Sequence, residues 1–199
     1  AAQGPDTHFD GKNFAKAFDI SYLDKEEKKQ FPYQNTWAIS TRMIGVMTAI
    51  HSDDKGLIIP PKVAPEKVVI IPILFKDTKF KVLKKAKELQ NKLKKYNTLL
   101  DERDGYSAGW KFNDWEMKGI PIRLELGPKD LQKGSVMLVR RDNGGMEIVK
   151  FAQLDKRITE VLEKIQVNLY NTANKFLNNH TIEVDTFSDF KNAINDKNI

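Results

Sequence analysis

The sequence contains no cysteine, only three histidines and no long apolar run. The absence of cysteine excludes disulfides and thiolate zinc sites within the chain, and it fits a reducing compartment. The histidines His8, His51 and His180 lie in no metal-ligand spacing such as H-x-x-x-H. No apolar segment approaches the ~18 residues that cross a bilayer, and nothing at the start resembles a signal peptide. We therefore expect no metal site in this chain and no membrane partner.

The short motifs of common enzyme classes are also missing, because the sequence has no G-x-S-x-G, no P-loop and no G-x-G-x-x-G. What the chain has in excess is positive charge, with 33 Lys and Arg against 27 Asp and Glu among 199 residues. A net charge of +6 favours a polyanionic partner such as nucleic acid or a nucleotide. The alternative is a generally lysine-rich surface, and composition alone leaves both open.

The first of three blocks covers residues 1–61. It begins with "AAQGPDTHFDGKNF", which has no initiator methionine and no helix start, so we expect a fragment of a longer protein. "NFAKAFDISYLD" alternates roughly and predicts a strand, and "YQNTWAISTRMIGVMTAIHSDDKG" predicts a short strand followed by a helix capped by Ser40 or Thr41. The proline-rich "IIPPKVAP" then predicts a connector.

The second block, residues 62–151, alternates strands and helices. "KVVIIPILF" predicts a strand that is covered on both faces, and "KFKVLKKAKELQNKLKKY" an amphipathic helix. A strand "NTLLD", a helix from Ser107 to Gly119, a strand "IPIRLELG" and a hairpin around Asp142–Gly145 follow. This order predicts an α/β fold with a mixed sheet. The third block, residues 152–199, predicts a long helix, a short strand "TIEV" and a last helix with a T-x-x-D cap.

Two places in the sequence carry candidate chemistry. The first is "TWAISTR", where Arg42 lies beside two hydroxyls at a strand-to-helix junction, and helix N-termini and arginine both attract phosphate. An ordinary helix cap with an exposed arginine explains the same residues.

The second place is Lys111–Leu131, which sets charges among the apolar residues of a strand. A reader of unpaired guanine needs a carboxylate for the N1–H and N2–H donors, an arginine for the O6 and N7 acceptors, and a ring for stacking. The stretch supplies those groups as Phe112, Glu116, Arg123, Lys129 and Asp130. Ordinary cross-strand ion pairs are the competing explanation. For the lysines of residues 79–95 we favour a solvated helix face over a specific role in RNA binding.

Two long stretches, "YQNTWAISTRMIGVMTAIHSDDKGLIIPPKVAPEKVVIIPI" and "GWKFNDWEMKGIPIRLELGPKDL", resemble prolyl-tRNA synthetases of the eukaryote- and archaeal-like type. The resemblance covers nearly the whole chain. It implies that residues 1–61 are the C-terminal part of a class II antiparallel catalytic domain with its third motif. It further implies that residues 62–151 are an anticodon-binding domain, a five-stranded mixed sheet flanked by helices, and that residues 152–199 begin a C-terminal extension.

The same resemblance assigns site residues. Arg42 matches the arginine of the third motif, which contacts ATP phosphate and is the candidate catalytic residue. The expected ATP and proline site comprises Gln3, His8, Trp37, Ser40, Thr41 and Arg42, and the expected anticodon site comprises Phe112, Glu116, Arg123, Lys129 and Asp130. Two positions depart from the family pattern, Asp6 in place of a usual threonine and Ala38 in place of a usual glycine, so the resemblance carries no substrate contact over to them.

The function implied is ATP-dependent activation of proline and its transfer to tRNA(Pro) by a cytoplasmic ligase that uses ATP and Mg2+ and forms a homodimer at full length. We expect this chain alone to be inactive, because the first and second motifs of the class are absent from it. We also expect no zinc in this chain. The alternatives are a non-catalytic tRNA- or mRNA-binding module and, less favoured, a nucleotide-binding regulatory protein.

Overall fold

The computed structural model describes residues 4–196 and divides the chain into two compact units, Ala1–Ala49 and Ile50–Ile199. The boundary falls within helix α2 (Arg42–His51). The domain ranges expected from the sequence therefore remain predictions, whereas the α/β class and the five-stranded mixed sheet are confirmed. Within the described residues, no helix is long and apolar enough to cross a membrane.

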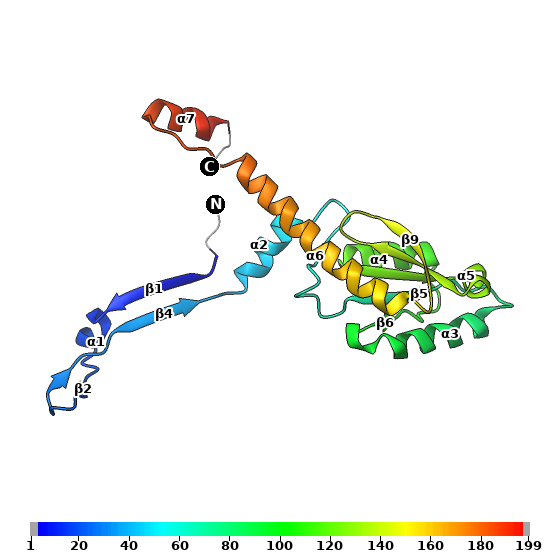
Figure 1. Cartoon of the computed structure of the whole chain (residues 1–199), viewed down its shortest axis with the longest axis horizontal. Coiled ribbons are helices and arrows are strands. Elements are labelled where there is room, and N and C mark those ends of the chain that lie inside the picture. Colours follow the sequence, from blue (N-terminus) through cyan, green and yellow to red (C-terminus); the bar gives the residue numbers. More distant parts are fainter. Residues whose placement is uncertain (1–3, 197–199) are drawn as a thin grey trace. The chain divides into compact units, whose positions relative to one another are not determined.

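The first unit is built on an antiparallel strand pair, β1 (Asp6–Gly11) with β4 (Gln34–Ala38) (Figure 1). A second, two-residue pair joins β2 (Tyr22–Leu23) to β3 (Lys29–Gln30). The predicted strand and helix around "TWAISTR" are confirmed as β4 and α2.

The strand predicted for "NFAKAFDISYLD" is wrong over its first half, which forms the short helix α1 (Asn13–Ala17). The alternating pattern misled because Phe14 and Phe18 are also one helical turn apart, and their rings lie 6.5 Å from each other. Such a short apolar run does not separate the two periods. Only Tyr22 and Leu23 of this stretch pair as a strand.

The second unit contains the mixed sheet, in the strand order β6-β5-β7-β8-β9. Strand β5 lies parallel to both β6 and β7, and β8 and β9 continue the sheet in antiparallel fashion. All five residues of β5 are buried, as expected for a strand covered on both faces. The strands are β5 (Val68–Pro72), β6 (Leu99–Leu100), β7 (Ile122–Leu126), β8 (Ser135–Arg140) and β9 (Met146–Lys150).

Helices cover the sheet unequally. On one face α3 (Lys79–Lys92) and α6 (Leu154–Asn179) share the main apolar core with Ile70 and Leu124. On the other face α4 (Ala108–Met117) packs against Val69 and Ile71 of β5 (Figure 1). No helix among residues 4–196 covers β8 and β9 on this second face, where Met146 and Ile148 are exposed.

Three further elements complete the second unit. These are the 3-10 turn η1 (Lys94–Tyr96), helix α5 (Pro128–Lys133) and helix α7 (Phe187–Asn195). The T-x-x-D cap of α7 is confirmed, because the Thr186 hydroxyl accepts a hydrogen bond from the Asp189 amide at 3.1 Å. Helix α5 was not foreseen, although Pro128 at its first turn and Gly134 in the left-handed conformation at its end are ordinary helix signals.

The strand predicted for "TIEV", residues 181–184, is wrong. These residues have no regular structure, and Ile182 and Val184 are exposed. A strand needs a neighbour for its backbone groups, and no described strand pairs with this segment.

Two glycines let the segment before the sheet lie against the turn between α4 and β7. The Leu57 amide donates to the Met117 carbonyl at 2.9 Å, and the Ile59 amide donates to the Gly119 carbonyl at 3.2 Å. Gly56 and Gly119 both have positive φ, and a Cβ on Gly119 would lie 2.7 Å from Leu57 atoms. This contact holds the C-terminal end of α4 in place.

Candidate nucleic-acid interface

Helix α4 presents two predicted site residues, Phe112 and Glu116, one turn apart. The helix begins at Ser107, whose hydroxyl accepts a hydrogen bond from the Trp110 amide at 3.2 Å, as predicted from the sequence. Residues four apart lie on one side of a helix, so Phe112 and Glu116 share a flank. That flank faces β7, because Phe112 packs beside Val69 and Ile71, whose neighbours in the sheet lie on β7.

Strand β7 places Arg123 and Glu125 on the same sheet face as α4. Its burial alternates, with Ile122, Leu124 and Leu126 in the main core and the two charged residues on the other side. The Arg123 Nε donates to Glu125 Oε1 at 2.9 Å, and the guanidinium carbon lies 4.6 Å from the centre of the Phe112 ring. The arginine thus lies over a ring and is bonded to a carboxylate, with 13% of its side chain exposed.

Glu116 and Arg123 line a common hollow of about 10 Å³, which has room for about one water molecule, so a base would contact these side chains from outside it. The Glu116 carboxylate is 24% exposed and pairs with the exposed Lys55, whose ammonium lies 3.2 Å away. Breaking an ion pair with an exposed lysine costs little free energy. A carboxylate whose partner is exposed and a guanidinium thus border the same hollow, and these are the two kinds of group that a guanine reader needs.

Arg141 also lines this hollow, and sequence reasoning missed it. Its side chain is 4% exposed, and its Nε donates to the Glu116 backbone carbonyl at 2.8 Å. Both terminal nitrogens donate to the Asp53 carboxylate, at 2.9 and 2.6 Å. These hydrogen bonds lower the pKa of Asp53 to about 2. No local pattern in "RRDNGG" predicts that Arg141 is buried and paired, because its partners lie 25 and 88 residues away in the sequence.

Lys129 and Asp130 lie beyond the opposite end of β7, on α5. Asp130 Oδ2 accepts a hydrogen bond from the Gly127 amide at 2.9 Å, so this carboxylate caps its own helix. Lys129 is exposed. Strand residues rise ~3.3 Å each, so Arg123 lies roughly 10 Å from the end of β7 at Leu126, and Lys129 follows beyond that end in α5. The five predicted residues therefore form two groups along one strand and not a single cluster.

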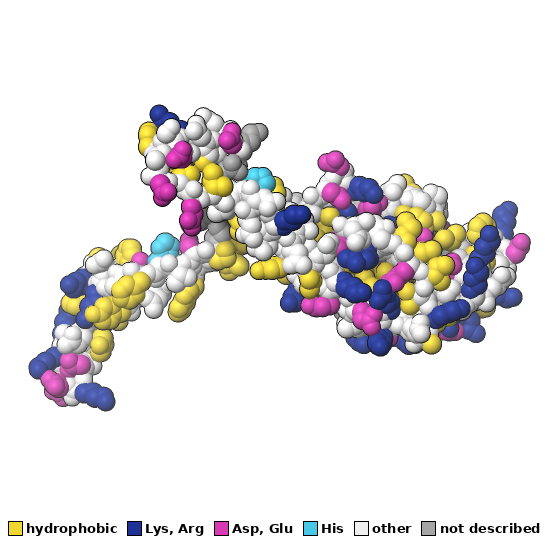
Figure 2. Space-filling view, turned by 45° about the horizontal axis from the view of Figure 1, so that its top comes forward, with side chains coloured by type: hydrophobic (Ala, Val, Ile, Leu, Met, Phe, Trp, Pro, Cys, Tyr) yellow, Lys and Arg dark blue, Asp and Glu magenta, His cyan; other side chains and the backbone are white. Residues whose placement is uncertain are grey.

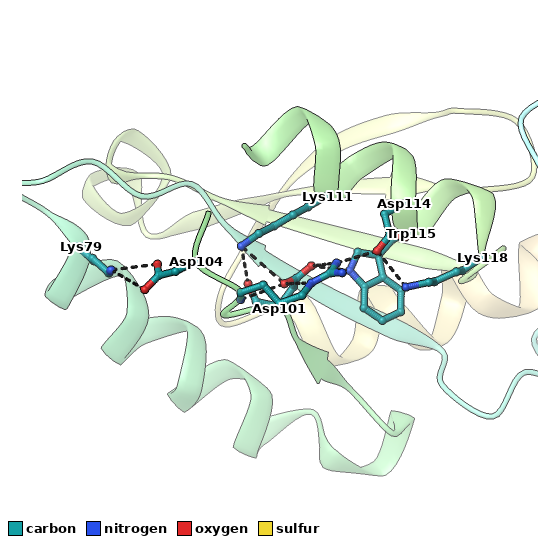
Figure 3. A network of polar contacts seen from close by, with 8 residues as sticks. Lys79, Asp101, Asp104, Lys111, Asp114, Trp115 and Lys118 are labelled. Atoms are coloured by element: carbon teal, nitrogen blue, oxygen red, sulfur yellow. Dashed lines mark hydrogen bonds and ion pairs between the residues drawn. The ribbon is translucent and has the colours of Figure 1, made fainter. Parts of the chain in front are cut away.

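The other flank of α4 is held by a polar network that sequence reasoning also missed (Figure 3). Its centre is Asp101, with 1% of its side chain exposed. Asp101 accepts hydrogen bonds from Arg103 at 2.9 and 2.6 Å and from the Trp115 indole at 2.8 Å, and the Lys111 ammonium lies 3.6 Å away. Figure 3 shows Lys111 and Trp115 reaching from α4 toward Asp101.

The electrostatics of this network favour the charged forms. Burial by itself raises the pKa of Asp101, but the hydrogen bonds from Arg103 and Trp115 outweigh it and hold the pKa well below its usual range. Arg103 also donates to Asp114 at 2.7 Å, which in turn accepts from Lys118 at 2.9 Å. Because Lys111 and Trp115 are on α4, the network sets the rotation of that helix and hence the direction of Phe112 and Glu116.

The first unit carries the predicted ATP and proline residues, and it does not bring all of them together. Thr7 pairs with Trp37, and His8 pairs with Thr36, so His8 and Trp37 lie on opposite faces of the β1–β4 pair. The His8 Nε2 lies 3.4 Å from an oxygen of Asp6. Gln3 lies outside the described residues.

Ser40, Thr41 and Arg42 lie together at the start of α2. The Ser40 hydroxyl accepts a hydrogen bond from the Arg42 amide at 3.3 Å, and the side chains of Thr41 and Arg42 are exposed. An exposed guanidinium at a helix N-terminus is a geometry that suits phosphate. Among residues 4–196 no three acidic or histidine side chains gather where they could hold a metal ion.

Comparisons with known proteins cover both units. Residues 67–161 match the family described as anticodon binding domain. A proline–tRNA ligase 2 of Bacillus thuringiensis is 46% identical over 197 residues, which is 99% of this chain and 41% of the relative. The proline–tRNA ligases of Oceanobacillus iheyensis and Natranaerobius thermophilus are each 44% identical, over 98% and 91% of this chain and 40% and 38% of their own lengths.

The chain thus spans about two fifths of the length of these relatives. The matched anticodon-binding region contains the whole five-stranded sheet together with α3, α4 and the start of α6. The chain is therefore similar to proline–tRNA ligases over about two fifths of their length, and its residues 67–161 match an anticodon-binding domain.

Proposed function

We propose that this chain is part of a proline–tRNA ligase, and that its second unit reads the guanines of the proline anticodon. The observation that carries this proposal is the arrangement at α4 and β7, where Arg123 lies on the Phe112 ring and shares a hollow with Glu116. Stacking on the ring and the bond to Glu125 orient the guanidinium plane. Nε and one terminal nitrogen face Glu125, and the other terminal nitrogen lies 3.5 Å from the Phe112 carbonyl oxygen. The remaining N–H groups of the two terminal nitrogens would meet guanine O6 and N7, and Glu116 would accept the N1–H and N2–H donors.

The second group, Lys129 and Asp130, extends the interface along β7. Asp130 uses only Oδ2 to cap α5, which leaves Oδ1 for an RNA donor. The exposed Lys129 contributes a positive charge beside it. Because roughly 10 Å of strand and the turn into α5 separate the two groups, we propose that they contact different nucleotides.

The test is guanine discrimination by the 199-residue chain. Anticodon stem-loop RNAs with guanine at the two reading positions are compared with RNAs that carry adenine there. Arg123→Ala should reduce the guanine preference about 5- to 150-fold, which corresponds to about 1–3 kcal/mol for a bidentate contact. Arg123→Lys is the matched control for charge, because it retains the positive charge and loses the fork geometry. It should bind RNA nearly normally and still lose the preference.

An unchanged preference for guanine in Arg123→Ala would contradict base reading at this site. Lys87→Ala, on α3, tests the specificity of the effect. It should change the binding of guanine and adenine RNAs by the same factor, since a lysine that meets phosphate does not distinguish bases.

For the first unit we propose a part in proline activation within the full-length enzyme, which uses proline, ATP and Mg2+ and acts as a cytoplasmic homodimer. The support is the position of Arg42, exposed at the start of α2 beside Ser40 and Thr41. Its guanidinium would stabilise charge on the ATP phosphate as the proline carboxylate attacks the α-phosphorus. Mg2+ would neutralise further phosphate charge when bound, and we assign none of the described residues to it.

Gln3, His8 and Trp37 belong to the same proposal as residues near proline and adenosine. ATP–pyrophosphate exchange checks it. The full-length protein should lose exchange activity on Arg42→Ala, and the 199-residue chain should show none. A measurable exchange rate from the 199-residue chain would refute its assignment as an inactive part. The alternative of a non-catalytic RNA-binding module has no support among the relatives, whose names are those of ligases.

A further inference from the structure

The positive charge of this chain is concentrated in one segment. Residues 76–96 contain nine lysines and two acidic residues, a net charge of +7, whereas the other 178 residues carry 24 basic and 25 acidic residues. A lysine-rich composition would spread the charge more evenly. The segment contains α3 and the two turns that flank it, and Figure 2 shows Lys and Arg side chains gathered on the unit that contains α3.

The lysines occupy the outer side of α3. The inner side buries Val82, Ala86 and Leu89 against the sheet. Lysines at the two flanks have partners, such as Lys79 with Asp104, Lys87 with Glu102 and Lys85 with Glu88. Lys81 and Lys84 on the outer side of α3, and Lys94 in the following turn η1, are exposed and form no ion pair with any of the described residues.

This arrangement opposes helix stability. Lys81 and Lys84 are three residues apart, and so are Lys84 and Lys87, which brings like charges together on one side of the helix. Phosphate groups along the helix would relieve this repulsion, and their own counterions would be released.

An aromatic ring accompanies the lysines. Phe80 is 80% exposed, the largest exposed fraction among the large apolar side chains of residues 4–196. It lies one residue from Lys81 and one helical turn from Lys84. A solvent-exposed ring beside cations is the combination that single-stranded nucleic acid uses, with a base on the ring and phosphates on the charges.

This surface is separate from the proposed anticodon site. Helix α3 covers the sheet face opposite to α4, so Phe112, Glu116 and Arg123 lie on the other side of the sheet. The two faces meet at the edge where the parallel strands β5 and β7 end. There the Ile73 amide donates to the Leu126 carbonyl at 2.9 Å, and α3 follows β5 as α5 follows β7. An RNA strand that passes Lys129 on α5 therefore reaches the start of α3.

We propose that Phe80, Lys81, Lys84 and Lys94 form a second RNA-binding surface, which holds the phosphate backbone and stacks one unpaired base without regard to sequence. This proposal depends on the proposed function only because that function identifies the polyanion as RNA. The surface adds affinity and rate of association, and the anticodon site adds base selectivity.

The test uses the 199-residue chain with the stem-loop RNAs above and with an unstructured RNA of the same length. The double variant Lys81→Glu/Lys84→Glu is compared with Lys164→Glu/Lys175→Glu, which makes the same charge change at exposed positions of α6. The first variant should bind every RNA about tenfold more weakly, and the slope of log affinity against log salt should fall by about 1.5. Its preference for guanine should not change. The α6 variant should retain the slope.

Equal effects from the two double variants, or a normal slope in the α3 variant, would overturn the proposal. Strong competition by polyglutamate at the charge concentration of the RNA would also overturn it, because the surface would then select acidic protein as readily as RNA. Loss of base discrimination in Arg123→Ala reports on the anticodon site alone, so the two proposals can fail separately.

Stacking of a base on Phe80 can be measured separately by fluorescence. Phe80→Trp places a reporter at the exposed ring, and RNA should quench its added fluorescence relative to the unsubstituted chain. RNA binding without that additional quenching would remove Phe80 from the surface. Circular dichroism should show unchanged helix content in every variant, because each substitution lies on an exposed helix position.

Discussion

At the scale of single residues, buried charges decide where the site residues point. Asp101 is enclosed, and its carboxylate accepts hydrogen bonds from Arg103 and Trp115. Arg141 is nearly as enclosed, and it ties Asp53 to the backbone of Glu116. Such pairs add little net stability as a whole, but removal of one member leaves the other buried without compensation. They act here mainly as devices that orient α4.

Replacement of the Asp101 carboxylate should therefore be costly. Asp101→Asn leaves the buried Lys111 without its negative partner and leaves Arg103 with Asp114 alone, and we expect a loss of about 3–5 kcal/mol in the free energy of unfolding. Urea unfolding followed by tryptophan fluorescence measures it. Asp104→Asn is the matched control, because Asp104 pairs with Lys79 at the surface and should cost less than about 1 kcal/mol. Equal losses of unfolding free energy in the two variants would show that the Asp101 network contributes no more to stability than a surface ion pair.

The Asp53–Arg141 pair predicts a dependence of stability on pH. The pKa of Asp53 is lowered in the folded state from 3.8 to about 2, so the unfolded chain binds the proton more readily. The contribution of this pair is complete above about pH 4 and is lost as the pH falls toward 2. The difference in unfolding free energy between the unsubstituted chain and Asp53→Asn should therefore shrink over that range. A difference that stays constant down to pH 2 would contradict the pairing.

At the scale of elements, the position of α4 depends on a backbone contact as well as on side chains. The segment from Gly56 to Ile59 hydrogen-bonds to the turn that ends α4, and both Gly56 and Gly119 have conformations that other residues rarely adopt. The sheet then supplies Arg123 through the register of β7 with β5. The proposed anticodon site thus forms where one helix end, one strand and one connector meet.

A glycine substitution tests this close approach. Gly119→Ala must adopt a positive φ and also push Leu57 away, whereas Gly105→Ala must adopt a positive φ with no atom within 4 Å of the new Cβ. Both alanines pay the free-energy cost of a positive φ, but only the alanine at position 119 also overpacks against Leu57. We therefore expect Gly119→Ala to be about 1–3 kcal/mol more destabilising than Gly105→Ala. Denaturant unfolding of the two proteins compares them directly, and similar stabilities would mean that the connector yields easily.

At the scale of the whole molecule, the two compact units have different cores. The second unit buries a continuous apolar core on one sheet face and a smaller one on the other. The first unit leaves large apolar side chains exposed, including Trp37 at 74% and Phe9 at 73%. Apolar surface in water contributes nothing to stability, so the second unit carries most of the folding free energy.

Removal of residues 1–49 should therefore leave the second unit folded. We expect a chain of residues 50–199 to unfold in urea with the same midpoint and slope as the second unit within the longer chain, because Asp53, Gly56 and Leu57 are retained. Trp110 and Trp115 report on it by fluorescence. A lower midpoint in the shorter chain would show that the first unit contributes to the stability of the second.

Much of the fold followed from local patterns. The buried strand β5, the amphipathic helices α3 and α6, the Ser107 cap and the β8–β9 hairpin all carry signals within a few residues, and all are confirmed. Failures came where a short segment has two possible periods, as in α1, or where a strand would need a partner that is absent, as at residues 181–184.

The sequence by itself determined the types of groups at the candidate site, since Phe112, Glu116 and Arg123 stand in one short stretch and alternation places Arg123 on a partly open face. Only the tertiary structure decided that Arg123 lies on the Phe112 ring, that Asp130 caps α5 and that Lys129 lies at the far end of β7. Only the tertiary structure showed that the buried Asp101 and Arg141 hold α4 in place. The physical reason is that a local pattern records the period of one element, whereas hydrogen bonds between residues far apart in the chain depend on how several elements pack.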